Sequence, residues 1–381
     1  MKKLVLVFEK LLNIHLVKDV GQIPYLLGKH FGFDASIACM NIDTYAHAKT
    51  TVKGLKLEFT NFGSYLYLIC NARKINVCML FHIRAKSIYQ GLIYKLLNPH
   101  GFLYIKSDLK DSVVPLVAKG KRGVLAQTYN RLLYNCFCRI VDLVSFETMA
   151  VFKAITSIAD HKKMYLPNGF DVTLPQSLGV HPKDVAEKQD IILCVARHGT
   201  EQKNSELLLQ ALEKIDDLGS WKFIFAGEAS QEFRNHCENF LKSNPQHVGK
   251  VILTGEISDR KPLFELYSQA KVFCLPSRWE SWGLVCTEAL YFGCALVMTR
   301  EVVSAPDLTD NGRAGLLAGN ENAVEWAEVL QNLMHDPKLV EHYSNQGRAH
   351  FNALFSWPDA LAPLAQRLLS NQQQSAGEIA G

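Results

Sequence analysis

The sequence predicts an α/β protein made of two doubly wound, Rossmann-like domains. Short apolar runs that are typical of buried strands alternate with helical patterns along most of the chain, and Gly, Pro or polar residues separate them. Alternating strands and helices favour parallel sheets that are covered by helices on both faces. At 381 residues the chain is long for one core, and the turn Leu166–Asp171 divides it into two such sets.

The first set precedes this turn. Its expected strands are Leu4–Phe8, Ala35–Met40, Ile75–Phe81, Phe102–Ile105 and Val141–Ser145. Helical patterns lie at Ile88–Leu97 and Val114–Arg139. The residues Asn41–Ile69 show neither pattern clearly, and we expect an extra hairpin there.

The second set has a clearer alternation. Its expected strands are Ile191–Ala196, Lys222–Ala226, Val251–Thr254, Val272–Leu275, Ala295–Thr299 and Gly315–Leu317. Its expected helices are Ser205–Ile215, Gln231–Leu241, Lys261–Gln269, Leu284–Phe292 and Ala323–Leu333. We therefore expect domains at residues 1–170 and 171–354, with a ligand in the cleft between them, because open α/β sheets bind ligands at the carboxyl ends of their strands.

Composition places the protein among ordinary soluble globular proteins, with 48% hydrophobic and 20% charged residues. The apolar run at the N-terminus is interrupted by Glu9 and Lys10, so it is too short for a signal peptide. No stretch approaches the ~18 apolar residues of a membrane span, and we expect a cytoplasmic protein. The ten cysteines lie mostly in apolar runs without a C-x-x-C pair, which indicates free thiols and no zinc site.

The segment Pro276–Leu290 runs from an expected strand into a helix. Gly283 at the helix start lets a ligand approach the backbone, and the free N–H groups there suit a phosphate. Glu280 and Glu288 lie beside this position. Two carboxylates next to a phosphate fit hydroxyl groups of a sugar and a ribose, so the segment favours a nucleotide sugar. For a bare pair of glutamates at this spacing, the alternative is two solvated helix residues.

The segment Val195–Leu209 also runs from a strand into a helix. Arg197 lies at the end of the strand and Lys203 lies near the helix. Two cations at a crevice can neutralise a diphosphate. For either residue alone, the alternative is a surface cation.

In this order, the segments LPNGFD, ARHGTEQKN, FIFAG, ILTG, LPSRWESWGLVCTEAL and NGRAGLL resemble the retaining nucleotide-sugar glycosyltransferases of family 4, which have the GT-B fold. The resemblance covers the second half of the chain nearly end to end. It implies an acceptor-binding first domain and a donor-binding second domain. It also implies that a helix at residues 355–370 crosses back to the first domain. From the small, polar composition of residues 371–381, we expect a flexible tail there.

The resemblance assigns roles to individual residues. Arg197 and Lys203 match the cations that bind the donor diphosphate, and Glu280 matches the glutamate near the donor sugar. The expected donor-binding residues are Gly21, Thr254, Gly255, Glu256, Ser281, Gly283, Leu284 and Glu288, of which Glu288 holds the ribose, Gly283 and Leu284 meet the phosphates, and Thr254 to Glu256 border the base.

The first domain departs from the family pattern. Lys106 occupies the place where some relatives have a histidine at the end of a strand, and His82 ends a different strand. His82, Lys106 and Asp108 are therefore the candidates for the acceptor side. A further departure is the segment Val302–Pro306, where relatives often have a glycine-rich element.

The mechanism that the resemblance implies is sugar transfer with retention of anomeric configuration to a glycan or lipid-linked acceptor. No D-x-D pair is present, so we expect Arg197 and Lys203 to stabilise the leaving diphosphate without a metal or other cofactor. Three alternatives to a glycosyltransferase are weaker. For a nicotinamide enzyme the sequence lacks the G-x-G-x-x-G motif. An epimerase of the same fold would need acid and base residues in the first domain that the sequence does not identify. Against a non-catalytic nucleotide-sugar-binding protein stands the presence of Arg197, Lys203, Glu280 and Glu288 together.

Charge is divided unevenly along the chain. Residues 1–171 contain 23 Lys or Arg and 11 Asp or Glu, a net charge of +12, whereas residues 172–381 contain 18 and 26, a net charge of −8. The cations of the first domain include Arg84, Lys86, Lys95, Lys106, Lys110, Lys119, Lys121 and Arg122. We expect this domain to bind an anionic membrane surface at the inner face of the membrane. The alternatives are a solvated basic face and, without any binding motif, nucleic acid.

Overall fold

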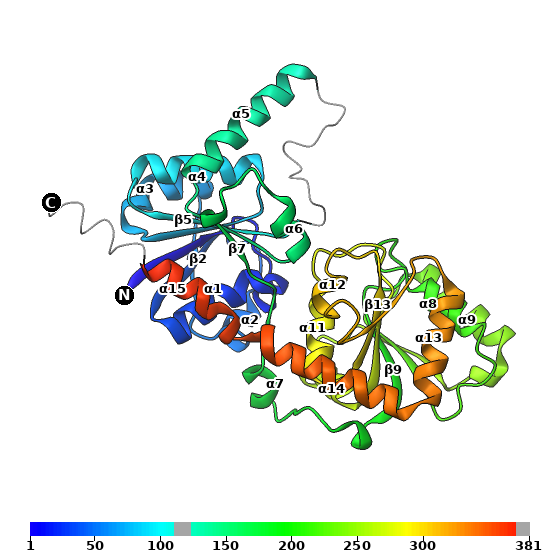
Figure 1. Cartoon of the computed structure of the whole chain (residues 1–381). Coiled ribbons are helices and arrows are strands. Elements are labelled where there is room, and N and C mark those ends of the chain that lie inside the picture. Colours follow the sequence, from blue (N-terminus) through cyan, green and yellow to red (C-terminus); the bar gives the residue numbers. More distant parts are fainter. Residues whose placement is uncertain (110–122, 371–381) are drawn as a thin grey trace. The chain divides into compact units, whose positions relative to one another are not determined.

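The computed structural model of the protein describes residues 1–109 and 123–370, and Figure 1 shows its arrangement. The chain forms two compact units. The first comprises Met1–Asp171 together with the segment that starts at Trp357, and the second comprises Val172–Ser356. Each unit is built on its own parallel sheet. The predicted fold class, two Rossmann-like α/β domains, is therefore confirmed.

The first unit contains a seven-stranded sheet with the order β3-β2-β1-β4-β5-β6-β7, in which all neighbours are parallel. The strands are β1 (Lys2–Val7), β2 (Phe33–Cys39), β3 (Lys56–Phe59), β4 (Val77–Phe81), β5 (Phe102–Ser107), β6 (Leu143–Phe146) and β7 (Lys163–Tyr165). All residues of β4 and β5 are buried, as central strands under two helical layers must be. The strand order reverses between β1 and β4.

Helices cover both faces of this sheet. They are α1 (Asp19–Phe31), α2 (Ala46–Thr50), α3 (Gly63–Asn71), α4 (Ala85–Leu97), α5 (Val124–Ile140), α6 (Met149–Ala154) and α15 (Ala362–Ser370). In Figure 1, α3, α4 and α5 lie on one side of the sheet, and α1 and α15 lie on the other. The last helix packs into the core through Leu364 and Leu368, and Lys2 Nζ donates to Leu368 O at 3.1 Å.

The hairpin that we expected within Asn41–Ile69 does not exist. This region forms the short helix α2, the strand β3 and the start of α3. Strand β3 runs parallel to β2, with Ile37 opposite Leu57. The expectation is wrong because a parallel neighbour needs a crossover connection, and the α2 segment provides it.

Lys106, on β5, is completely buried. Its Nζ donates to Glu147 Oε1 at 3.2 Å and to Leu166 O at 3.3 Å, and Asn168 Nδ2 donates to the same carboxylate oxygen at 2.9 Å. Burial raises the pKa of Glu147 to about 7, against the effect of the Lys106 charge. The expectation that Lys106 contributes to an exposed basic surface is therefore wrong, because an internal ion pair holds this side chain.

The second unit contains a six-stranded sheet with the order β11-β10-β9-β12-β13-β14, again with parallel neighbours only. The strands are β9 (Gln189–Val195), β10 (Lys222–Ala226), β11 (Val251–Gly255), β12 (Ala270–Leu275), β13 (Ala295–Thr299) and β14 (Leu316–Ala318). All six were expected from the sequence. The strand order reverses between β9 and β12.

The helices of this unit are α7 (Thr173–Ser177), α8 (Glu206–Leu212), α9 (Gln231–Ser243), α10 (Arg260–Gln269), α11 (Leu284–Tyr291), α12 (Ala305–Leu308), α13 (Ala323–His335) and α14 (Pro337–Leu354). Two short strands, β8 (Phe170–Asp171) and β15 (Ser356–Trp357), lie where the chain passes between the units. Short 3-10 turns occur at Asn13–Val17, Ala72–Lys74, Asp160–Lys162, Val185–Glu187, Pro245–His247 and Asp359–Leu361.

Helix α14 was not expected from the sequence. Most of its surface is polar, but Val340, Ser344, Gly347 and Phe351 are buried at helical spacing. A Cβ on Gly347 would lie 2.8 Å from Leu290 Cδ2. This glycine therefore allows α14 to pack closely against α11, and its presence within the helix has a structural reason.

Candidate donor site

The carboxyl ends of β9 and β12 meet where the strand order of the second sheet reverses. In open α/β sheets a ligand crevice forms at such a point. Residues 196–205 follow β9 and residues 276–283 follow β12. Arg278 N donates to Gln202 O at 2.8 Å, which joins the two loops. The two segments that were expected to carry the chemistry are thus side by side.

His198 anchors the loop that follows β9. Its ring is 1% exposed, stacks on Phe233, and forms hydrogen bonds through Nε2 with Ala226 O at 3.2 Å and through Nδ1 with Ser205 Oγ at 2.8 Å. Because a carbonyl only accepts, Nε2 carries the proton and Nδ1 accepts from the Ser205 hydroxyl. Burial lowers the pKa of His198 to about 4. The neutral ring therefore holds the loop against β10.

Lys203 and Glu280 form an ion pair between the two loops. Ser277 Oγ donates to Glu280 Oε1 at 2.8 Å, and Gln202 Nε2 donates to Glu280 Oε2 at 3.3 Å. The side chain of Lys203 is 16% exposed and that of Glu280 is 9% exposed. Glu280 is thus fixed by three partners and Lys203 by the ion pair, and both side chains are largely shielded from bulk water.

Arg197 is exposed at the end of β9, and Thr200 Oγ1 donates to its carbonyl oxygen at 3.0 Å. The second cation of the pair that we expected therefore lies on the same loop as Lys203. Unlike Lys203, it is freely accessible to a ligand.

Gly283 directly precedes α11, as expected of the glycine at this helix start. Its backbone is left-handed, with φ 95°, and a Cβ there would lie 3.2 Å from Leu275 Cδ2. Leu284 begins the helix, Ser281 is partly exposed just before it, and no side chain caps the helix start. The first N–H groups of α11 thus remain for an anionic ligand.

Glu288 pairs with Arg260, a residue that the sequence did not single out. Glu288 is only 8% exposed, so it is not a solvated helix residue. Arg260 begins α10, and its guanidinium lies 4.6 Å from the ring centroid of Phe264. Its place in the first helical turn after β11 was a usable signal, since that turn lies at the carboxyl edge of the sheet.

The buried thiol of Cys286 lies within the electrostatic influence of Glu280, Lys203 and Glu288. Burial is the main reason that its pKa is raised well above the ordinary value, and the charges of Glu280, Lys203 and Glu288 all act on it. The two glutamates and the lysine therefore share one electrostatic environment around α11. The structure brings these three predicted residues together.

Thr254, Gly255 and Glu256 lie at the carboxyl end of β11, with Thr254 and Glu256 exposed. Gly227 N donates to Gly255 O at 2.9 Å. Gly227 has φ 129°, and a Cβ there would lie 2.1 Å from Ala196 O. Only glycine fits, so Gly227 is a further residue that shapes this edge, and its place directly after a strand in FIFAG was the available signal.

The predicted residues of the first unit fall into separate places. Gly21 is buried within α1, where a Cβ would lie 2.5 Å from Leu16 Cα, so its packing requires glycine. His82 follows β4 and pairs through Nδ1 with Asp108, which follows β5. Lys106 is buried in the core, where it pairs with Glu147. The structure thus brings together two of the three acceptor-side candidates.

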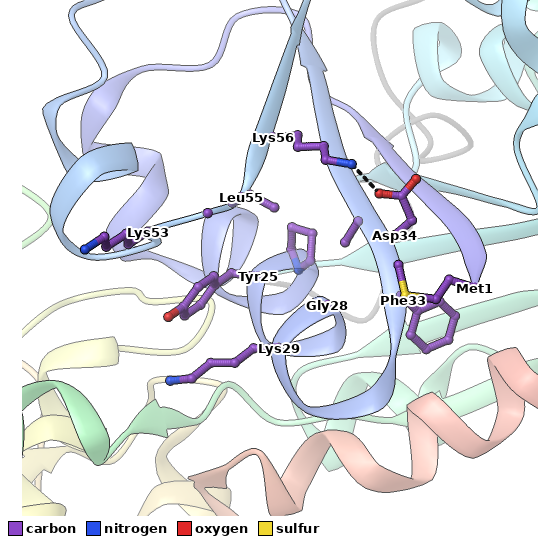
Figure 2. Close-up of a pocket in the computed structure, with 12 residues that line it drawn as sticks. Met1, Tyr25, Gly28, Lys29, Phe33, Asp34, Lys53, Leu55 and Lys56 are labelled. Atoms are coloured by element: carbon purple, nitrogen blue, oxygen red, sulfur yellow. Dashed lines mark hydrogen bonds and ion pairs between the residues drawn. The ribbon is translucent and has the colours of Figure 1, made fainter.

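A cavity of about 430 Å³ lies in the first unit, beside the starts of β2 and β3. Figure 2 shows Tyr25, Lys29 and Lys53 around it, and an ion pair of 2.7 Å between Lys56 and Asp34. Because it lies at the amino ends of the strands, it is at the edge of the sheet opposite to the one that binds ligands in open α/β folds.

Within residues 1–109 and 123–370, no cluster of three or more His, Cys, Asp or Glu has the arrangement of a metal site. In the same described part of the chain, no helix has the length and apolar character that crossing a membrane requires.

Comparison with known proteins adds three findings. Residues 181–350 match the model "Glycosyl transferases group 1". The chain is 35% identical over 369 residues to the alpha-maltose-1-phosphate synthase of Mycolicibacterium smegmatis, which covers 91% of both proteins. It is 28% identical over 165 residues to the alpha-1,4-N-acetyl-D-galactosaminyltransferase of Campylobacter jejuni that is named for the lipid GalNAc-alpha-(1->4)-GalNAc-alpha-(1->3)-diNAcBac-PP-undecaprenol, over 42% of this chain and 43% of that protein.

Among solved structures, the chain resembles HepE from Anabaena in complex with UDP, with a TM-score of 0.68 and 16% identity over the full length of both chains. Two parallel-sheet domains and this likeness define the GT-B fold. The chain belongs to the glycosyltransferase group 1 family, since a relative above 30% identity matches nearly its whole length.

We expect the pH dependence of stability to report the buried, neutral His198. The unfolded state takes up its proton near 6.5 and the folded state only near 4, so stability falls as the pH drops through this window. Between pH 7 and pH 5, His198 should cost the wild type about 2 kcal/mol of unfolding free energy. His198→Gln, whose amide keeps a donor for Ala226 O, should lose less in urea unfolding. Equal losses in both proteins would contradict this account.

Proposed function

We propose that the protein transfers a sugar from a nucleoside diphosphate sugar to a glycan or lipid-linked acceptor with retention of configuration, in surface polysaccharide or glycolipid synthesis. The observation that carries this is the grouping of Lys203, Glu280, Gly283 and Glu288 at the switch point of the second sheet. The UDP named with HepE and the lipid-linked acceptor named with the Campylobacter enzyme support these substrate classes. We also propose that the protein is a member of glycosyltransferase family 4.

The diphosphate binds to Arg197, Lys203 and the first N–H groups of α11. Negative charge builds on the diphosphate as its bond to the sugar breaks, and fixed cations and N–H groups stabilise that charge. Glu280 holds Lys203 in place before the donor arrives. When the diphosphate binds, Lys203 exchanges part of this contact for the phosphate, and Glu280 becomes available to sugar hydroxyls.

The nucleoside binds along the edge formed by β11 and α11. Glu288 accepts hydrogen bonds from the ribose hydroxyls, and Arg260 keeps its carboxylate in place through the ion pair. The exposed residues Thr254 and Glu256 border the base. No metal takes part in this proposal, because two cations and a helix N-terminus supply the positive charge.

Arg197→Ala should lower kcat by about a hundredfold or more, the scale of losing one preorganised oxyanion donor. Its fold should be unaffected because the side chain is exposed. Lys222→Ala removes another exposed cation, at the amino end of β10, and should leave kcat unchanged. Release of free nucleotide in the presence of acceptor is the measurement. Normal turnover by a folded Arg197→Ala protein would remove this residue from the mechanism.

Excess EDTA should leave the rate nearly unchanged, because protein cations replace the Lewis acid. Initial rates are compared before and after chelation and again after manganese or magnesium is added. A rate that collapses with EDTA and returns with either metal would show that the charge argument is wrong.

The first unit is also proposed to bind an anionic membrane surface. Exposed apolar side chains lie just before α3, at Phe62, along α3, at Leu66 and Ile69, and along α5, at Leu125 and Leu132. Both helices contact α4, so they lie on the same side of the first sheet. Apolar side chains on a basic unit match an anionic lipid surface, which attracts the cations and accepts the apolar groups.

The described structure supports only part of the charge on which this expectation was based. Lys110, Lys119, Lys121 and Arg122 lie outside the described residues. Lys95 forms an ion pair with Asp142 at 3.0 Å. The exposed apolar residues of α3 and α5 are therefore the main support for binding to a membrane surface.

Leu125→Asp combined with Leu132→Asp should reduce sedimentation with anionic liposomes by at least tenfold in partition coefficient. Burying one leucine contributes about 1.5–3 kcal/mol, and both side chains are more than 60% exposed in the free protein. Val248→Asp, at an exposed apolar residue of the second unit, is the matched control. Binding should also weaken as salt rises. Unchanged sedimentation of the double variant would leave a soluble acceptor as the better interpretation.

A further inference from the structure

A second cavity of the first unit lies at the carboxyl ends of β1 and β4, where the order of the first sheet reverses. Its volume is about 240 Å³. Glu9 and Lys10, which follow β1, line it together with His82 and Arg84, which follow β4. The position is equivalent to that of the candidate donor site in the second sheet, and it is where an open α/β sheet binds a ligand.

The lining carries excess positive charge. Its described cations are Lys10, Arg84 and Lys86, and its carboxylate is Glu9. Glu9 is already paired with Lys86 and accepts from Ser64 Oγ at 2.8 Å, and the bond with Lys86 is the main reason that its pKa is lowered. Lys10 and Arg84 are exposed and form no ion pair within the part of the chain that the structure describes. Two cations therefore remain for a ligand.

His82 is held in the wall of this cavity by strained backbone. Its φ is 62°, which is costly for a residue with a side chain. His82 N donates to Lys106 O at 2.8 Å, and Ser87 Oγ donates to His82 O at 2.6 Å, so bonds on both sides maintain the strain. Asp108 holds Nδ1. Nε2 is consequently the ring nitrogen that remains for a ligand, and the side chain is 24% exposed.

The size of the cavity limits what it holds. Pockets for drug-sized ligands occupy about 300–1,000 Å³, and at about 240 Å³ this cavity has room for a single phosphate or diphosphate group. Cations and a fixed histidine nitrogen suit the oxygens of a phosphate ester or diphosphate. We infer that this cavity binds the phosphate of a phosphorylated acceptor, with Lys10 and Arg84 as its counter-charges and His82 as its hydrogen-bonding group. The inference rests on the proposed glycosyltransferase function, of which it names the acceptor class.

The test uses inorganic pyrophosphate as the probe and calorimetry of the full chain as the measurement. Because the donor site also attracts diphosphate, two pairs of substitutions are combined. Lys10→Ala with Arg84→Ala changes the cavity, and Arg197→Ala with Lys203→Ala changes the donor site. We expect two pyrophosphate sites in the wild type, one in each double variant and none in the quadruple variant. In the Arg197→Ala, Lys203→Ala background, removing Lys10 and Arg84 should weaken binding by at least tenfold.

Lys29→Ala with Lys53→Ala is the control, because it removes two exposed cations from the cavity at the opposite sheet edge in Figure 2. It should leave both pyrophosphate sites unchanged, and a loss equal to that of the Lys10, Arg84 variant would overturn the inference. A wild type with one pyrophosphate site that only the Arg197 and Lys203 substitutions affect would also overturn the inference. That result would still support the proposed donor site. Loss only with Lys10 and Arg84 would support the cavity and contradict the donor site. Binding that neither pair changes, or no binding at all, would refute the phosphate site.

Two further probes separate the sources of the phosphate. Farnesyl diphosphate stands for a lipid-linked acceptor, and glucose 1-phosphate stands for a soluble one. Both should lose at least tenfold in affinity when Lys10 and Arg84 are removed in the Arg197→Ala, Lys203→Ala background. Tighter binding of farnesyl diphosphate than of pyrophosphate indicates a lipid-linked acceptor, and the reverse order with measurable glucose 1-phosphate binding indicates a soluble one. Insensitivity of both probes to the substitutions would overturn the inference.

Discussion

The reversal of strand order in each parallel sheet is the constraint on which both candidate sites depend. In the second unit the reversal lies between β9 and β12, and in the first it lies between β1 and β4. At such a point the two neighbouring strands connect to helices on opposite faces of the sheet, so the loops at their ends leave a crevice that is open to a ligand. The second sheet places Lys203 opposite Glu280 in this way, and the first places Lys10 near His82. Neither grouping exists without the topology, because its members are far apart in sequence.

Several of the charged groups at these strand ends are paired within the protein before any ligand is present. Lys203 pairs with Glu280, Arg260 with Glu288, and His82 with Asp108. A partly buried charge without a partner is costly, so pairing lets the protein keep reactive groups in a shielded place. The pairs also fix each side chain in one position. A ligand then meets a preorganised site and pays less to order it.

The two halves of the chain have net charges of opposite sign. The acidic second half places its site cations at the proposed diphosphate site, whereas the basic first half presents exposed cations around the proposed acceptor cavity. Charge counted along the sequence overstates this surface. Lys106 and Lys95 belong to internal or partly buried ion pairs, and Lys86 is engaged by Glu9. In the described part of the first unit, Lys10 and Arg84 are exposed at the proposed acceptor cavity, and exposed apolar residues lie on α3 and α5.

The sequence by itself determined the fold class, the strands of the second sheet and the segments around Arg197 and Gly283, because these depend on local patterns of apolar residues and turns. Tertiary structure decided the rest. It placed β3 parallel to β2, where the sequence suggested a hairpin, since register between strands is not a local property. It also paired Glu288 with Arg260 and buried Lys106. Partners of a charged side chain are chosen by proximity in the folded chain, and no spacing rule along the sequence contains that information.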